Sequence, residues 1–321
     1  MTSTSETRTE MPTDKIKILL DTDIADDIDD AIALSFALAS PEFQLLGVTT
    51  VYGDVDTRTR VARKLVRAWG RNDVPVVPGY ERPFQFDWHE GTEPEVPSQR
   101  NAVADDTEPV DRSRTAPDFI AETVRRHPGE VYVLTIGACT NVAAALCANP
   151  SLAGAIPGVV SLVGYLPPRL DVPEWNVRYD PLAASAIARS GVRWTAIPAN
   201  VQGENHLSRE EFDALAASDR APARLLVELI VLMKQNKAGG DPDVRSIADV
   251  TRAHVADVMT LASFLIPEEM ALTPGWVDVD AVGALSFRED PAGPHRLARS
   301  AVAGTAYRAE ILRRVLGGRL D

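Results

Sequence analysis

Apolar runs of strand length alternate with segments of helical periodicity along most of this 321-residue chain. The first run, residues 16–20, precedes apolar residues at helical spacing over 31–39, and the pair repeats as a strand at 43–51 and a helix at 57–69. Strands joined by single helices through short connections lie parallel, because each helix returns the chain to the same edge of the sheet. The sequence therefore predicts a Rossmann-like α/β fold, with a mostly parallel sheet covered by helices on both faces.

The alternation continues further along the chain. Strands are expected at residues 74–79, 131–136, 159–163 and 194–197, and helices at 116–126, 141–148 and 181–189. Residues 208–237 and 255–265 read as extra C-terminal helices, and residues 276–279 and 284–287 as extra strands. The polar stretch over 1–14 has no apolar signal-peptide core. We expect a disordered leader over residues 1–14 and one domain over 15–321.

The segment from Tyr80 to about Arg114 interrupts this pattern, because it is dense in Pro, Glu and Asp and shows no periodicity. Irregular segments of this length in compact domains are usually functional or disordered. We predict a lid over a binding site, carrying the side chains of Phe84, Phe86, Trp88 and His89.

Acidic residues outnumber basic ones by 46 to 33, which gives a net charge of −13. Such a charge repels nucleic acids and anionic membranes, and no apolar run reaches the length of a membrane span. The only cysteines, Cys139 and Cys147, suit a reducing compartment. We expect a cytoplasmic protein whose partner is a small molecule or a cation, and neither a nucleic acid nor a membrane.

Six aspartates follow the first strand within ten residues: Asp21, Asp23, Asp26, Asp27, Asp29 and Asp30. Ligands of such sheets bind beyond the carboxyl ends of the strands, where this cluster falls. Helix capping accounts for Asp29 and Asp30 but not for Asp21 and Asp23 at the strand end. Carboxylates held together at this junction require a cation, and hard oxygen ligands favour Ca²⁺ or Mg²⁺.

Two other metal-binding patterns fit the cluster less well. An EF-hand loop needs Gly at its sixth position and Glu at its twelfth, and counting from Asp21 those positions hold Asp26 and Ile32. Phosphatases of the haloacid-dehalogenase type also place two aspartates after an apolar strand. They usually carry Thr or Val where this chain has Ala25, so a metal-dependent phosphatase is the weaker alternative.

The cluster resembles, in a longer form, the signature Asp-x-Asp-Pro-Gly-x-Asp-Asp-Ala of the inosine-uridine-preferring nucleoside hydrolase family. Further motifs of that family follow in order at residues 47–54, 136–143 and 174–181, and at Asp257 with the helix after it. The resemblance extends along nearly the whole chain from Ile16. It implies Ca²⁺-dependent hydrolysis of the N-glycosidic bond of ribonucleosides, to ribose and a free base, by a homodimer or homotetramer active in nucleoside salvage.

The resemblance also implies roles for single residues. It assigns Ca²⁺ ligands to four of them: the carboxylates of Asp23, Asp30 and Asp257, and the backbone carbonyl of Thr140. It places substrate-binding side chains at Asp29, Asp54, Glu174, Trp175 and Asn176. Asp21 would support the cluster, whereas the extra Asp27 binds metal or substrate or only shapes the turn.

Glycoside chemistry agrees with these assignments. Hydrolysis passes through an oxocarbenium-like sugar, which nearby carboxylates stabilise. A carboxylate that shares the cation with a water can accept the proton of that water, and Asp23 is our candidate for this base. A cation bound to the ribose diol would orient the anomeric carbon towards the water.

The leaving-group side departs from the family pattern. Ala256 stands where purine-acting members commonly carry a His that protonates the departing base. His254 lies three positions ahead of Asp257 and could face the same side of a helix, although an ordinary surface or core histidine explains it as well. His89 of the expected lid is a second candidate, for contact with the base or the 5′-hydroxyl. A catalytically silent nucleoside-binding protein, or a hydrolase of a modified nucleoside, therefore remain alternatives.

Overall fold

A sheet crosses the centre of the protein in the computed structural model, which describes residues 15–85, 93–94, 96–201, 207–237, 255–300 and 304–316. Within these residues it has nine strands, in the order β3-β2-β1-β4-β5-β6-β9-β7-β8. The strands are β1 (Ile16–Thr22), β2 (Phe43–Thr50), β3 (Val76–Pro78), β4 (Val131–Thr135), β5 (Val159–Leu162), β6 (Trp194–Ile197), β7 (Leu272–Val279), β8 (Leu285–Glu289) and β9 (His295–Ala298). All adjacent pairs from β3 to β9 are parallel, and β7 is antiparallel to both β8 and β9.

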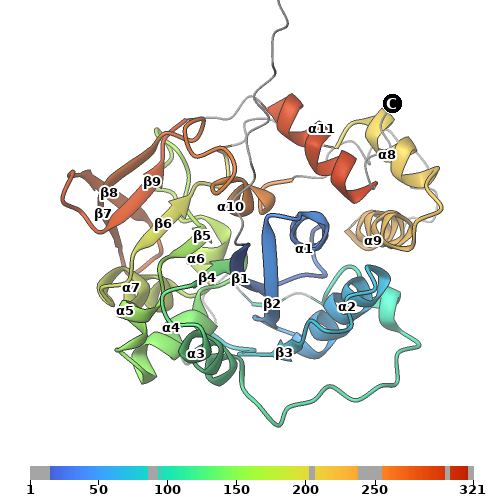
Figure 1. The fold of residues 1–321 in the computed structure, drawn as a ribbon, viewed down its shortest axis with the longest axis horizontal. Coiled ribbons are helices and arrows are strands. Elements are labelled where there is room, and N and C mark those ends of the chain that lie inside the picture. Colours follow the sequence, from blue (N-terminus) through green and yellow to red (C-terminus); the bar gives the residue numbers. More distant parts are fainter. Residues whose placement is uncertain are drawn as a thin grey trace, which may run out of the picture.

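Helices cover both faces of the sheet (Figure 1). They are α1 (Asp29–Ala39), α2 (Val55–Ala68), the 3-10 helix η1 (Arg100–Val103), α3 (Ala116–Arg126), α4 (Thr140–Ala148), α5 (Leu152–Ala155), α6 (Trp175–Tyr179), α7 (Pro181–Arg189), α8 (Arg209–Ala216), α9 (Ala221–Lys237), α10 (Val258–Ala262) and α11 (Gly304–Val315). The expected single-domain α/β fold is confirmed.

Two hydrophobic cores form because the side chains of a strand alternate between its faces. On β1, Ile18 and Leu20 belong to the core under α1, α2, α9 and α11, whereas Leu19 belongs to the core under α3, α4 and α7. All three side chains are at most 1% exposed. Burial of each side chain stabilises the fold by about 1.5–3 kcal/mol. Together the three side chains fix the direction of β1 and therefore the position of the acidic cluster at its end.

Several predicted elements have the expected bounds, among them α3, α7 and β6, and α1 begins at Asp29 as part of the acidic cluster. The short helix α6, the strand β9 and the helix α11 were not predicted. The segment after Tyr80 is only partly irregular, since it contains η1, whose Ala102 carbonyl accepts a hydrogen bond from Lys64 Nζ at 2.7 Å. The leader and the lid residues Phe86, Trp88 and His89 lie outside the described residues.

Cys139 and Cys147 are both free, the first buried and the second exposed. Among the described residues, no helix combines the length and the apolar character that a membrane crossing demands.

Candidate active site

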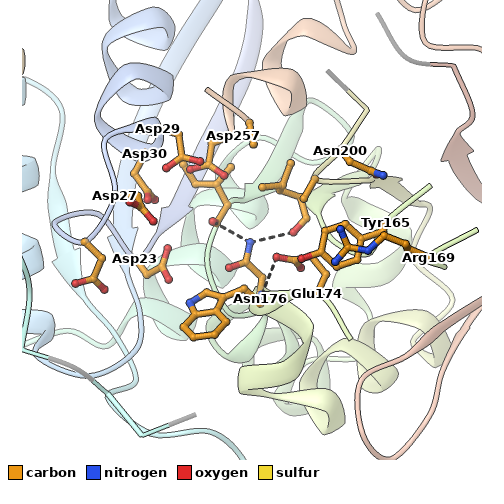
Figure 2. Close-up of a pocket in the computed structure, with 16 residues that line it drawn as sticks. Asp23, Asp27, Asp29, Asp30, Tyr165, Arg169, Glu174, Asn176, Asn200 and Asp257 are labelled. Atoms are coloured by element: carbon orange, nitrogen blue, oxygen red, sulfur yellow. Dashed lines mark hydrogen bonds between the residues drawn. The ribbon is translucent and has the colours of Figure 1, made fainter. Parts of the chain in front are cut away.

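A cavity of about 520 Å³ opens at the carboxyl ends of β1, β4, β5 and β6. Its lining residues are Asp23, Asp26, Asp27, Asp29, Asp30, Ile136, Leu162, Tyr165, Arg169, Glu174, Trp175, Asn176, Ala199, Asn200, Ala256 and Asp257. Figure 2 shows the aspartates on one side, Tyr165, Arg169 and Asn200 on the other, and Glu174 and Asn176 between them. We call the first side the acidic wall and the second the far wall.

Three carboxylates of the acidic wall converge on one point. Oxygen atoms of Asp29, Asp30 and Asp257 all lie within 4.8 Å of one another. Asp29 and Asp30 are the first two residues of α1, and Asp257 precedes α10, which packs against α1. Asp30 and Asp257 are buried, whereas Asp29 is half-buried at the cavity surface.

Burial and mutual repulsion make this arrangement costly without a cation. Desolvation, followed by the charges of neighbouring aspartates, raises the pKa of Asp30 and of Asp257 well above the usual range. Desolvation raises the pKa of Asp23 to about 6, although the positive charge of Arg58 opposes the shift. An all-oxygen set of this kind fits a hard divalent cation such as Ca²⁺ or Mg²⁺.

Contacts behind the wall hold these carboxylates in place. The Thr22 hydroxyl donates a hydrogen bond to Asp30 Oδ1. Asp21 does not line the cavity; its buried Oδ1 accepts hydrogen bonds from Thr49 Oγ1 at 2.5 Å and Asn141 Nδ2 at 2.8 Å. Desolvation raises the pKa of Asp21 to about 7. These contacts agree with a supporting role for Asp21.

Gly137 allows the loop after β4 to approach the loop after β1. A Cβ atom at this position would lie 2.8 Å from Asp23 N and 2.9 Å from Val51 Cγ1, closer than packed atoms approach. The glycine of the motif at residues 136–143 is therefore required by the contact with the Asp23 backbone.

Asn176 presents a fixed hydrogen-bond acceptor to the cavity. Its Nδ2 donates to the carbonyls of Ile136 at 3.1 Å and Leu162 at 3.0 Å, the contacts drawn in Figure 2. Both amide hydrogens are thereby used, which leaves Oδ1 to accept from a ligand hydroxyl.

Glu174 caps α6 and also faces the cavity. Its Oε1 accepts from Asn176 N at 3.0 Å, while the buried Oε2 has no hydrogen-bond partner among the described residues. Desolvation raises the pKa of Glu174 to about 8. An unpaired buried carboxyl oxygen is expensive, so this atom is a contact point for a bound ligand.

The far wall is built from loops and is more exposed. The Arg169 guanidinium lies over the Tyr165 ring, 4.3 Å from its centroid, and Arg169 is the one cationic side chain among the described lining residues. Asn200 Oδ1 accepts from Leu166 N at 2.7 Å, which ties the loops after β5 and β6 together. Trp175 is 50% exposed at the rim and packs edge-on against Tyr179.

Two residues predicted to bind the metal or the substrate do not reach the cavity. Thr140 is buried at the start of α4, and its hydroxyl donates to Asp180 Oδ2 at 2.7 Å. The backbone position of this motif that does line the cavity is Ile136, directly after β4. Asp54 is exposed and caps α2, accepting from Thr57 N at 3.0 Å, and it is not among the residues that line the cavity.

The remaining predictions divide between the cavity and the undescribed residues. Trp175, Asp27 and Ala256 line the cavity. His89 and His254 lie outside the described residues. The lining residues that were not predicted are Ile136, Leu162, Tyr165, Arg169, Ala199 and Asn200. The supporting Arg58 was not predicted either, because the sequence offered only a basic residue near the start of an amphipathic helix.

Comparisons with known proteins agree with the geometry. The sequence model of the family described as inosine-uridine preferring nucleoside hydrolase matches residues 18–304. Probable uridine nucleosidase 2 of Arabidopsis thaliana is 31% identical over 68% of this chain and 69% of its own length. The pyrimidine-specific ribonucleoside hydrolase RihA of Citrobacter koseri is 28% identical over 79% of this chain and 81% of its own length. Among solved structures, a purine-preferring ribonucleoside hydrolase from Gardnerella vaginalis matches with a TM-score of 0.76 and 25% identity, over 94% of this chain and 98% of its own.

Proposed function

The chain belongs to the inosine-uridine preferring nucleoside hydrolase family and hydrolyses the N-glycosidic bond of ribonucleosides, and from this premise we propose that its reaction depends on Ca²⁺ bound at the acidic wall. The observation that carries the proposal is the convergence of Asp29, Asp30 and Asp257 within 4.8 Å, opposite the fixed acceptor of Asn176. We propose uridine as the first substrate to test, since two relatives are named for uridine or pyrimidine ribonucleosides.

We assign the carboxylates to the cation or to the ribose according to how deeply each is buried. Asp23, Asp30 and Asp257 are buried and therefore depend most on a cation, so we assign them to it. The carbonyl at Ile136, in place of that of Thr140, supplies the backbone ligand. Asp29 reaches the same point but is half-buried at the cavity surface, so we assign it to the ribose hydroxyls, which would lie beside the cation.

When bound, Ca²⁺ would acidify a coordinated water and coordinate the ribose 2′- and 3′-hydroxyls. Asp23 accepts the proton of the attacking water, because its pKa of about 6 permits an ionised carboxylate near neutral pH. Asn176 Oδ1 accepts from a ribose hydroxyl and holds the sugar against the acidic wall. Negative charge on this wall stabilises the oxocarbenium-like sugar as the bond to the base breaks.

The base lies towards the far wall, where Tyr165 and Arg169 offer an aromatic face and one cation, while Trp175 lies at the rim. Ala256 provides no proton donor at the position where purine-acting relatives commonly carry a His. The described part of this wall therefore suits contact with the base better than its protonation.

The test is ribose release by the purified full chain from uridine, inosine and cytidine, before and after treatment with a strong chelator. We expect release of reducing sugar that stops in chelator and returns with added Ca²⁺. The matched control substrate is p-nitrophenyl phosphate, which a phosphatase would hydrolyse. Phosphate release without ribose release, or tight nucleoside binding without turnover, would overturn the proposal in favour of one of the alternatives.

A further inference from the structure

Arg58, on α2, is completely buried although arginine is among the residues least often found in protein interiors. It does not line the cavity; it lies behind the loop that joins β1 to α1. A buried guanidinium is stable only when its donors are paired. The partners of Arg58 are therefore informative about why the residue is there.

The guanidinium joins two loops at the carboxyl edge of the sheet. Nη1 donates to the carbonyls of Asp23 and of Ile24, the latter at 2.9 Å. Nε donates to the carbonyl of Tyr52, in the loop after β2, at 2.6 Å. Arg58 thus binds the backbone at the residue whose side chain is the proposed base.

Asp26 completes the set as the counter-ion. Its Oδ2 accepts from Arg58 Nη2 at 2.6 Å, while its side chain remains 31% exposed at the cavity. Asp26 belongs to the lengthened form of the acidic cluster, in which sequence alone assigned it no role. The contact shows that its carboxylate is engaged by Arg58.

The backbone between these contacts adopts a conformation that needs support. Ala25 has φ of +101°, a region that favours glycine, the residue at this place in the signature that the cluster resembles. Arg58 holds the carbonyl before it and the carboxylate after it. From the opposite side, Gln99 N donates to the Ala25 carbonyl at 2.9 Å and Ser98 Oγ to the Asp26 carbonyl at 2.5 Å.

We propose that Arg58 is a positioning residue that, with Asp26 as its counter-ion, holds the lengthened acidic loop in its cation-binding conformation. The inference rests on the proposed Ca²⁺ site and names what organises it. Asp26 is accordingly a partner of Arg58 and not a ligand of the cation, even though it lines the same cavity.

Calorimetric Ca²⁺ titration of the chelator-treated full chain, without nucleoside, tests the proposal. We expect Arg58→Met to weaken Ca²⁺ binding at least 10-fold and to lower kcat more than it raises KM for uridine. Arg58→Lys keeps the charge and part of the hydrogen bonding. The logarithm of its Ca²⁺ dissociation constant should therefore lie at least a third of the way from the Arg58→Met value back to the wild-type value. Asp26→Asn should weaken Ca²⁺ binding less than 3-fold, whereas Asp30→Asn should weaken it at least 30-fold.

A matched control separates positioning from general destabilisation. Arg314, on α11, also makes a half-buried multiple ion pair, with Glu42 at 2.7 Å and Glu310 at 2.6 Å, and it does not line the cavity. Arg314→Met should lower the melting temperature and leave Ca²⁺ affinity unchanged. Adding Ala25→Gly to Arg58→Met should restore part of the Ca²⁺ affinity, because glycine adopts the required backbone conformation without help.

Each outcome decides the matter. If the wild-type chain binds no Ca²⁺, the proposed function fails before Arg58 is in question. If the wild type binds Ca²⁺ and Arg58→Met binds it equally well, the inference about Arg58 is overturned. Asp26→Asn weakening Ca²⁺ as strongly as Asp30→Asn would make Asp26 a ligand and also overturn it. Should Arg58→Met not fold, Arg58→Lys and Asp26→Asn carry the same comparison.

Discussion

The two walls of the cavity are built in different ways. On the acidic wall, carboxylates project from strand ends and helix starts and are fixed from behind by buried partners such as Thr22 and Arg58. On the far wall, Tyr165 and Arg169 belong to a loop, and the Arg169 guanidinium lies over the Tyr165 ring. The difference supports our proposal that elements of the sheet bind the sugar and the cation, whereas loops that can change without disturbing the sheet contact the base.

The largest effect should come from the acidic wall. Asp30→Asn keeps the size of the side chain and its hydrogen bond to Thr22 but removes the charge. We expect kcat for uridine to fall about 10³-fold, since a charge acting on the transition state is lost. Ribose release and circular dichroism would be measured together. A fall of less than 10-fold in a folded variant would remove the contrast between the walls.

The next effect should come from the substrate. A 2′-deoxyribonucleoside lacks one hydroxyl of the diol and leaves a proposed partner, Asp29 or Asn176, without its hydrogen bond. We expect kcat/KM for 2′-deoxyuridine to be about 10²-fold below that for uridine. Equal kcat/KM values for the two substrates would show that the acidic wall does not bind the two ribose hydroxyls specifically.

A smaller effect should follow changes on the far wall. Arg169→Met removes the cation but keeps an apolar contact with Tyr165. Because the Arg169 side chain is exposed, we expect kcat/KM for uridine to fall by about 10-fold or less. The comparison variant is Arg178→Met. The guanidinium of Arg178 contacts Trp175, but Arg178 does not line the cavity. A fall of kcat/KM near 10³-fold for Arg169→Met would show that activity depends on the far wall as strongly as on the acidic wall.

The smallest effect concerns stability and depends on pH. The folded pKa values of Asp23, Asp21 and Glu174 are raised to about 6, 7 and 8, so the cation-free folded state holds protons that the unfolded chain has released. The stabilisation is therefore complete below the unfolded pKa values near 4 and is lost as the pH rises through 6 to 8.

We expect the melting temperature in chelator to fall by about 5 °C between pH 5.5 and 8.5. With Ca²⁺ the fall should be smaller, because the cation pairs with ionised carboxylates. Scanning fluorimetry at both conditions measures the difference. A melting temperature in chelator that rises with pH would show that these three carboxyl groups are not buried without a positively charged partner in the cation-free protein.

The sequence predicts the acidic wall better than the far wall, for physical reasons. Asp23, Asp29 and Asp30 follow a strongly patterned strand and open an apolar helix, so local periodicity places them at the sheet edge. Asp54 caps α2 and does not line the cavity, and helix capping and ligand binding use the same residue types. Their different roles depend on which direction the side chain takes, and sequence does not encode that locally.

Other features depend on contacts between distant segments. Arg58 meets Asp23 across 35 positions of the chain, and no local pattern marks such a pairing. Strand β9 was missed because it is short and inserts between β6 and β7, out of chain order. The far wall combines loops after β5 and β6, whose joint geometry follows from Asn200 binding the Leu166 backbone.

A leaving-group series tests the contrast between the walls most directly. The measurement is kcat/KM for uridine, inosine and p-nitrophenyl riboside, which share the sugar but differ in how readily the leaving group departs without protonation. The acidic wall is organised to bind the sugar, whereas Ala256 stands at the usual position of the acid. We therefore expect kcat/KM for p-nitrophenyl riboside to exceed that for either nucleoside by at least about 10²-fold. Equal rates for all three would show that the far side protonates the base efficiently and would contradict this division of the cavity.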